Sequence, residues 1–421
     1  MATRRRARRD YTVQHDTYRP SLRALDQVLR LGRHLGIIRL DADQVLRAAR
    51  RRTGLTDWGD EAFIPRMAKL IETANDLDLS GLGTFSAQNT FIQAVENRLR
   101  IQRYLDRFPE VADIPIRRPI FILGFPRTGT TLLQNLLSLA PGHRELRFWE
   151  LTSPVPLHDD PDRDRAIRYR KARTLIRLAY FIAPEQRHIH AIDVDSVEEC
   201  WPLFFNEFAV MNYDLVAHFD DFGDWLLSTD MTEPYRYYRR TLQLLAHWQP
   251  TTQYLLKCPE HLWFLDALTT VFPDACIVWT HRDPVASTAS YSSLSSLGYR
   301  MVHGRIHHDR IGRHTTQRFA QGVERAMAAR ARLGEDRFFD VNFKDLVRDP
   351  ATVVRQIRAH FDLEQPPGSE EAMAAFLARK RSDFKGAHVY SPAQWGLDPD
   401  EVRSHFTDYI DRFDITLEDK R

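Results

Sequence analysis

The stretch GFPRTGTT, from Gly124 to Thr131, constrains the fold more than any other part of this sequence. It follows the apolar run PIFILGF and precedes TTLLQNLLSLA, whose leucines recur at helical spacing. The sequence therefore predicts a glycine-rich turn between a buried strand and a helix. Gly124 and Gly129 have the Gly-x4-Gly spacing of a phosphate-binding loop, but Thr130 stands where such a loop carries its lysine.

The alternation of strand and helix continues along the chain. YLLKCP, CIVWTH and RFFDVNF are typical of buried strands, and helical patterns follow in EHLWFLDALTTVF, after Asp283-Pro284, and in ATVVRQIRAHF. This alternation predicts an α/β fold, with a P-loop-like parallel sheet flanked by helices. We assign this domain to residues 116–414, with a helical, aromatic-rich insertion at residues 150–250.

The first part of the chain has a different character. Residues 21–115 show helical periodicity without recognisable chemistry, as in LRALDQVLRLGRHLGI, where Leu22, Leu25 and Leu29 recur at helical intervals. We expect this region to form helices with an apolar face to bury. Residues 1–20 are predicted to be a basic, disordered tail, and residues 415–421 a second tail.

Composition argues against several classes of protein. With 421 residues, 43% of them apolar, the chain can bury a large core, and its net charge of +2 gives no signature of nucleic-acid binding. No apolar run approaches the roughly 20 residues that span a bilayer. Membrane contact through the basic N-terminus is open but not favoured. Cys200, Cys258 and Cys276 form neither a disulfide framework nor a zinc pattern, so we expect a reducing, cytoplasmic setting.

The chemistry of the glycine-rich loop suits phosphate or sulfate oxygens. A glycine turn that opens a helix presents backbone N–H groups to an anion, and Arg127 adds a planar fork of donors. A second anion site follows CIVWTH, where Arg282 ends the strand and Ser290 lies eight residues further on. A kinase or NTPase would need the missing lysine and Mg²⁺. It stays an alternative, as does a non-catalytic nucleotide-binding module on the same fold.

FPRTGTTLL together with HRDPVASTASYSSL resembles the donor-binding motifs of the PAPS-dependent sulfotransferases, in the bacterial branch whose loop reads PRTGTT. YLLKCPEHLWFLDAL and HVYSPAQWGLDPDEVRSHFTDYIDRF are similar to further segments of that branch. The resemblance implies in-line sulfuryl transfer from 3′-phosphoadenosine-5′-phosphosulfate (PAPS) to a hydroxyl or amine acceptor, which leaves 3′,5′-adenosine bisphosphate. No metal is expected, because the sulfuryl group carries one charge and protein cations and N–H groups can hold the leaving phosphate.

The resemblance also implies which residues bind the donor. The 5′-phosphosulfate loop would comprise Arg127, Thr128, Gly129, Thr130 and Thr131, with Arg127 supplying the charge. Arg282 and Ser290 would hold the 3′-phosphate, and Lys385 and His388 in KGAHVY would close over it.

Catalysis needs a cation near the leaving oxygen and a base for the acceptor's proton. The resemblance makes Lys257, at the end of YLLK, the expected cation beside Arg127. It favours Glu150 in RFWEL as the base, because related enzymes with a similar loop use a Glu further along the chain. His190 in RHIHAID, with Glu198 and Glu199, is the alternative. Cys258 is expected to be a small buried residue without chemistry.

Two further patterns concern partners. The aromatic residues of the insertion fit either a pocket for a hydrophobic acceptor (a phenol, a lipid or a sterol-like alcohol) or plain core. They are Phe204, Phe205, Phe208, Tyr213, Phe219, Phe222, Trp225, Tyr235, Tyr237 and Tyr238. The histidines of HGRIHHDRIGRH, residues 303–314, come with no acidic partner at a ligand spacing. We expect a solvated basic loop there that closes over the site, and no metal centre.

Overall fold

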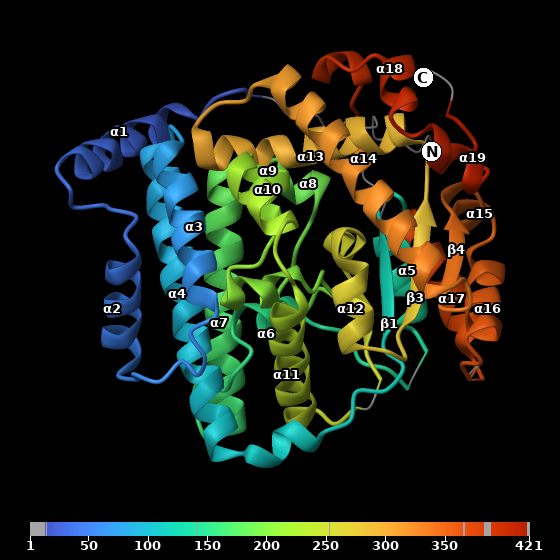
Figure 1. Ribbon diagram of the computed structural model, residues 1–421, viewed down its shortest axis with the longest axis horizontal. Coiled ribbons are helices and arrows are strands. Elements are labelled where there is room, and N and C mark those ends of the chain that lie inside the picture. The colour runs from blue at the N-terminus through green and yellow to red at the C-terminus, as the bar shows by residue number, and fades with distance from the viewer. Residues whose placement is uncertain are drawn as a thin grey trace, which may run out of the picture.

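The structure is a computed structural model that describes residues 13, 15–140, 142–251, 253–364, 367–382 and 389–418. These residues form a four-stranded parallel sheet with the strand order β2-β1-β3-β4 (Figure 1). The strands are β1 (Ile120–Gly124), β2 (Leu255–Lys257), β3 (Cys276–His281) and β4 (Phe338–Asn342). Each lies within a segment that the sequence predicts as a strand, and the predicted α/β fold is confirmed.

Helices cover both faces of this sheet, which explains why its central strands β1 and β3 are buried along their whole length. Side chains alternate between the two faces along a strand. Ile120 and Ile122 of β1 pack with α5 (Thr130–Leu137), α15 (Phe343–Arg348), α16 (Pro350–His360) and α17 (Ser369–Ser382). Phe121 and Leu123 face the larger core, which includes α12 (Leu265–Val271), α13 (Pro284–His303) and α14 (His308–Leu333).

The strand order creates a switch point between β1 and β3. After β1 the chain crosses to β2 on one side, and later returns to β3 on the other side of β1. Segments that leave the carboxyl ends of β1 and β3 therefore flank one crevice, where open α/β sheets bind ligands. The glycine-rich loop follows β1 and Arg282 follows β3, so both expected anion sites border this crevice.

The N-terminal region is helical, as predicted, and lies at the opposite side of the molecule from β4 (Figure 1). It contains α1 (Pro20–His34), α2 (Ala42–Thr53), α3 (Phe63–Asp76) and α4 (Gly81–Arg107). Its apolar residues share one core with the insertion, because α4 packs against both α13 and the 3₁₀ helix η2 (Trp201–Glu207). Tyr18, within the expected N-terminal tail, is buried and contacts the Ser80 hydroxyl. The described end of that tail is therefore packed.

The insertion is helical and contributes most of its aromatic side chains to the core. Its helices are α6 (Phe148–Thr152), α7 (Pro161–Ile182), α8 (Gln186–Ile189), α9 (Asn212–Ala217), α10 (Asp220–Leu227) and α11 (Thr232–Trp248). Buried among these are Phe204, Phe208, Phe219, Phe222, Tyr235, Tyr237 and Tyr238, while Phe205, Tyr213 and Trp225 are partly buried against them. Of the two interpretations of this aromatic pattern, plain core describes most of its residues.

The C-terminal segment returns to the sheet. The 3₁₀ turn η4 (Pro392–Trp395), α18 (Pro399–Ser404) and α19 (Thr407–Arg412) lead to Tyr409, which packs on Trp279 of β3. Ile415 is buried beyond them. This path carries the last described residues back to the end of β3.

Two 3₁₀ turns complete the described elements: η1 (Pro109–Asp113) before β1, and η3 (Pro259–Phe264), which forms the first half of the helix predicted at residues 260–272.

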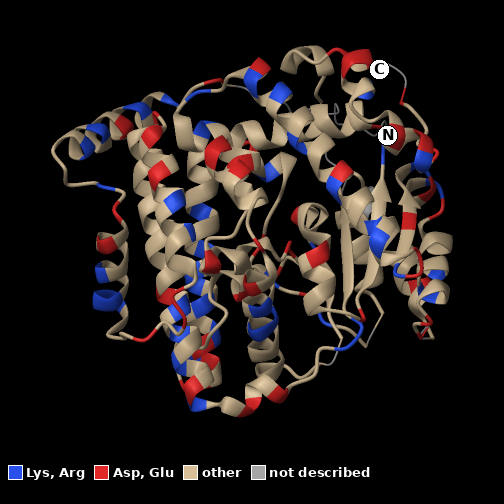
Figure 2. Ribbon diagram, viewed as in Figure 1, with Lys and Arg blue, Asp and Glu red and all other residues tan. Residues whose placement is uncertain are grey.

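Charge is mixed over the molecule. Lys and Arg alternate with Asp and Glu along most helices in view (Figure 2), in keeping with the small net charge. Among the described helices, none combines the length and apolar character needed to cross a bilayer.

Candidate active site

The glycine-rich loop has the backbone geometry of an anion cradle. Gly124, Arg127 and Gly129 all have positive φ angles, of 134°, 75° and 92°. A Cβ on Gly124 would lie 2.3 Å from the Thr280 hydroxyl, so glycine lets the loop pack against β3. Gly129 caps α5 without a side-chain hydrogen bond, which leaves the first N–H groups of this helix available to a ligand.

Thr128 braces the loop from inside. Its hydroxyl donates to the Phe125 carbonyl at 2.7 Å and lies 2.5 Å from the Thr280 hydroxyl. The Thr128 side chain is fully buried, so it supports the loop. Thr130 is buried at the first turn of α5, whereas Thr131 is exposed beside it.

Arg127 joins the two predicted anion sites. Its Nε donates to the Ser290 hydroxyl on α13 at 3.0 Å. Burial lowers the pKa of this guanidinium, and Arg127 makes no ion pair with any carboxylate of the described residues. A desolvated cation without a counter-ion among the described carboxylates, carried on the loop that opens α5, suits an anionic ligand.

Arg282 lies on the other side of the crevice and already holds an anion. Its Nη1 donates to the Arg127 carbonyl at 2.9 Å, and its guanidinium stacks over Phe343 at 4.2 Å. Its Nε and Nη2 donate to the two carboxylate oxygens of Glu418 at 2.6 and 2.9 Å. Tyr390 also hydrogen-bonds Arg282. Nothing in the sequence pointed to Glu418, because its position depends on how the C-terminal segment folds back.

The C-terminal segment is tied to the same corner by a second ion pair. Asp283 caps α13 by accepting from the Val285 N–H, and its other oxygen accepts from the Glu418 N–H at 2.7 Å. Arg403 donates to Asp283 at 3.0 Å and to the Glu418 carbonyl at 3.2 Å. Lys385 and His388, the other residues expected near the 3′-phosphate, lie outside the described residues.

Lys257 reaches the loop from the end of β2. Its Nζ lies 3.4 Å from the Thr131 hydroxyl and 2.8 Å from an oxygen of Glu199. Burial would raise the pKa of Glu199, but the Lys257 charge outweighs it and holds this pKa below the ordinary glutamate value. The Cys200 N–H donates to the Lys257 carbonyl at 3.0 Å, which fixes the two segments side by side. The sequence singled out both Lys257 and Glu199 as candidate catalytic residues, but it gave no signal that they pair.

His190 belongs to the same region. Its Nε2 lies 3.6 Å from a carboxylate oxygen of Glu198, and its side chain is partly exposed. His190 also lowers the pKa of Glu199 through electrostatic attraction. The structure thus brings the alternative group, His190 with Glu198 and Glu199, next to Lys257.

Glu150 has a different setting. As the third residue of α6 it accepts from the Arg147 N–H at 3.0 Å, and its other oxygen forms a buried ion pair with Arg144. It lines a cavity of about 740 Å³ with Arg144, Arg147 and residues that precede β1 and β2 in the chain, such as Pro115 and Pro250. Both carboxylate oxygens are therefore engaged in holding α6.

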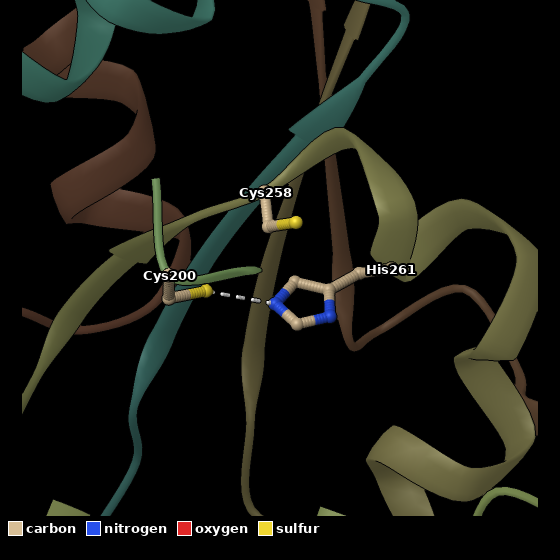
Figure 3. A group of neighbouring side chains, drawn as sticks. All are labelled: Cys200, Cys258 and His261. Carbon is tan, nitrogen blue, oxygen red and sulfur yellow. Dashed lines mark hydrogen bonds between the residues drawn. The ribbon is translucent and has the colours of Figure 1, made fainter. Parts of the chain in front are cut away.

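Cys258 has close neighbours. Cys200, Cys258 and His261 converge in the core just past the end of β2 (Figure 3), and their ligand atoms lie within 4.8 Å of one another. The Cys200 Sγ lies 3.3 Å from His261 Nε2, and the Tyr235 hydroxyl lies 2.7 Å from His261 Nδ1. Cys258 also hydrogen-bonds Cys200. These side chains satisfy one another, so the cluster is explained as a hydrogen-bonded part of the core.

The histidine segment differs from the expected solvated loop. His303 ends α13 and bonds the Ala217 carbonyl, and buried His314 lies 3.0 Å from Asp214 and 3.1 Å from Asp220. The expectation was wrong because these carboxylates come from α9 and α10, nearly a hundred residues earlier. Burial lowers the pKa of neighbouring His218 to about 2, whereas for His314 the two carboxylates outweigh burial and raise the pKa. The two imidazole rings stack, with ring centres 3.9 Å apart.

Known proteins share this architecture. The model of the sulfotransferase family matches residues 119–367. The structure is similar to that of sulfotransferase STF9 from Mycobacterium avium, with 29% identity, a TM-score of 0.79, and coverage of 90% of this chain and 98% of that one. Sulfotransferase STF1 from Mycobacterium tuberculosis H37Rv gives 30% identity, a TM-score of 0.76, and coverage of 87% and 98%.

A curated relative carries a more specific name. The omega-hydroxy-beta-dihydromenaquinone-9 sulfotransferase Stf3 of Mycobacterium tuberculosis is 22% identical over 346 residues, which are 78% of this chain and 84% of the relative. The family match covers more than half of the chain and includes the glycine-rich loop, Lys257, Arg282 and Ser290. This chain therefore belongs to the sulfotransferase family and is an enzyme of sulfuryl transfer.

Proposed function

We propose that the protein transfers a sulfuryl group from PAPS to a hydroxyl-bearing, hydrophobic small molecule and releases 3′,5′-adenosine bisphosphate. The contact between Arg127 Nε and the Ser290 hydroxyl, at 3.0 Å, carries this proposal. It joins two motifs that lie 163 residues apart. A single nucleotide with phosphate groups at both its 5′ and 3′ positions can therefore engage both.

The donor would lie across the crevice between β1 and β3. The 5′-phosphosulfate would meet the guanidinium of Arg127 and the N–H groups at the start of α5, with Thr128, Gly129, Thr130 and Thr131 shaping the cradle. The 3′-phosphate would take the place that the Glu418 carboxylate holds on Arg282, beside Ser290. Lys385 and His388 stay predictions for this end of the donor.

We assign Lys257 the role of stabilising the charge on the leaving group. Its Nζ borders the loop at Thr131, where the bridging oxygen of a bound phosphosulfate would gain charge during transfer. A lysine that moves toward this oxygen also moves away from Glu199. Burial then acts on Glu199 without the opposing charge, so its pKa rises and the carboxylate becomes a stronger base.

We therefore assign Glu199 as the base for the acceptor's proton, with His190 and Glu198 beside it. The earlier prediction of Glu150 is kept as the competing assignment. The contacts of Glu150 with Arg144 and the Arg147 N–H favour a structural role for it. Protein cations and N–H groups suffice for this scheme, so we propose that it runs without a metal.

The proposal for the acceptor rests on the acceptor for which a relative of this chain is named. Stf3 is named for a hydroxylated menaquinone, a lipid with a terminal hydroxyl. The same chemistry, an apolar body with an exposed hydroxyl, is our proposal for this enzyme. The three cysteines are unpaired, in keeping with the predicted cytoplasmic setting, which stays a prediction.

Calorimetry with 3′,5′-adenosine bisphosphate and with ATP, both without metal, tests the donor. We expect the bisphosphate to bind and ATP to bind at least about tenfold more weakly, because ATP has no phosphate for Arg282. Arg282→Ala should abolish the preference. A preference for ATP that requires Mg²⁺ would instead support a kinase or NTPase and would overturn the proposal.

A further inference from the structure

We propose that one face of α1 docks this enzyme on an anionic lipid bilayer. The α1 face consists of Leu25, Val28, Leu31 and Leu35, with Ile37 just beyond, and all five side chains are exposed. The inference rests on the proposed function only where it concerns the acceptor. The docking itself follows from the sequence and geometry of α1.

The α1 face is a continuous apolar stripe. Its residues follow one another at intervals of three and four, so they lie along one side of the helix. Val28, Leu31 and Leu35 have exposed fractions of 66%, 59% and 65%. The fold already buries another side of α1, where Leu22 packs with Leu82 and Ile182. α1 therefore has apolar side chains both on the side that the protein buries and on a side that it leaves exposed. An exposed apolar surface of this kind marks an interaction site.

Charge near the α1 face identifies the partner. Arg23, Arg30 and Arg33 lie on α1, and Figure 2 shows basic positions along this helix. The sequence before it adds Arg4, Arg5, Arg6, Arg8, Arg9 and Arg19, whereas the acidic residues up to position 40 are Asp10, Asp16 and Asp26. At helical spacing the three arginines of α1 fall on the side of the helix opposite the stripe, where Arg30 also pairs with Asp26. A helix with one apolar face and an arginine-rich polar face is typical of those that lie in the interface of anionic membranes. Two copies of this chain would repel each other across the same basic surface.

Near the start of α1, Arg19 contacts the end of α7, from which the chain leads to the proposed catalytic residues. Arg19 bonds the Phe181 carbonyl at the end of α7, and its guanidinium lies 5.1 Å from the centre of the Phe181 ring. Leu178 and Phe181 are exposed there, which extends the apolar surface. The chain then runs through α8 to His190 and on to Glu199, the partner of Lys257.

Flotation with lipid vesicles tests the docking. Wild-type protein is mixed with vesicles of phosphatidylglycerol and phosphatidylcholine, or of phosphatidylcholine alone. We expect binding to the anionic vesicles that weakens with salt. The variant Val28→Gln/Leu31→Gln/Leu35→Gln should bind at least about tenfold more weakly, because apolar burial drives insertion. The single variant Val28→Gln has a matched control in Val347→Gln. Val347 lies on α15 with an exposed fraction of 57%, and its replacement should leave vesicle binding unchanged.

The outcomes separate docking from catalysis. Calorimetry with 3′,5′-adenosine bisphosphate should give the same affinity for wild type and the α1 variant, which also shows that the variant is folded. Equal vesicle binding by wild type and variant, or no binding by wild type, would overturn the proposal. A wild-type dimer in light scattering that the variant loses would assign the α1 face to a second copy and overturn it as well. Failure of bisphosphate binding alone would contradict the proposed function and leave the docking result standing.

Discussion

Glu418 holds the guanidinium of Arg282 with both of its carboxylate oxygens, at 2.6 and 2.9 Å. The pair lies where the 3′-phosphate of the donor is proposed to bind. A carboxylate that occupies a phosphate site competes with the phosphate, and it must leave when the donor enters. The last described residues of the chain are therefore part of the proposed donor site.

Glu418→Gln should tighten the binding of 3′,5′-adenosine bisphosphate. The amide loses the charge that competes for Arg282, and for this partly exposed pair we expect a gain of about three- to tenfold. Calorimetry on the variant measures it. Glu401→Gln, an exposed carboxylate on nearby α18, serves as the control and should leave the affinity unchanged. Unchanged affinity in Glu418→Gln would mean that the carboxylate does not compete.

Arg127→Ala and Ser290→Ala should differ in severity. Arg127 supplies the cation of the 5′ cradle and also orients Ser290, so its loss affects both ends of the donor. We expect bisphosphate binding to weaken by about a hundredfold in Arg127→Ala, as for a charge-assisted contact, and by about tenfold in Ser290→Ala. Titration calorimetry compares them. An equal loss in both variants would contradict the assignment of the charge to Arg127.

The pH dependence of kcat/KM distinguishes Glu199 from Glu150. In the free enzyme Lys257 holds the pKa of Glu199 below the ordinary glutamate value, so kcat/KM should fall only in acid, as this carboxylate gains its proton. Glu199→Gln should lower kcat by about a hundredfold or more and remove this acidic limb. In Lys257→Met the residual activity should show the limb at higher pH, because burial then raises the pKa of Glu199 against only the smaller effects of His190 and Trp201.

Glu150→Gln should act on stability instead. It leaves Arg144 buried without its ion-pair partner, which costs about 3–5 kcal/mol of the free energy of unfolding. The acidic limb of the rate should persist in the protein that remains folded. Denaturant unfolding and the pH–rate profile together decide the matter, since a lost limb at unchanged stability would make Glu150 the base.

Local sequence patterns predicted the parts of this molecule that depend on local physics. The strand Cys276–His281 and the loop after β1 are readable because burial on both faces and a helix-opening glycine turn constrain nearby residues. The partners of Lys257 and Arg282 were not predictable, because Glu199 and Glu418 arrive from distant segments through tertiary folding. Leu25 shows the same limit on α1, where a helical pattern of leucines does not reveal which side the protein covers.

The buried carboxyl of Glu260 should make the free energy of unfolding depend on pH in an unusual direction. Burial raises the pKa of this carboxyl to about 8, although the Met211 N–H and the Asn212 amide donate to it at 2.9 and 2.7 Å. The folded state thus retains a proton that the unfolded chain releases near the ordinary glutamate pKa. Stability that derives from this group is present below that value and is lost as the pH rises toward about 8.

Glu260→Gln should remove this loss. The neutral amide needs no proton, so the free energy of unfolding should fall less steeply above pH 5 than in wild type, by up to about 1.4 kcal/mol per pH unit. Urea unfolding at a series of pH values measures the slope, and Glu364→Gln, at an exposed carboxyl, is the control. Parallel curves for wild type and Glu260→Gln would mean that the two hydrogen bonds keep this buried carboxyl ionised.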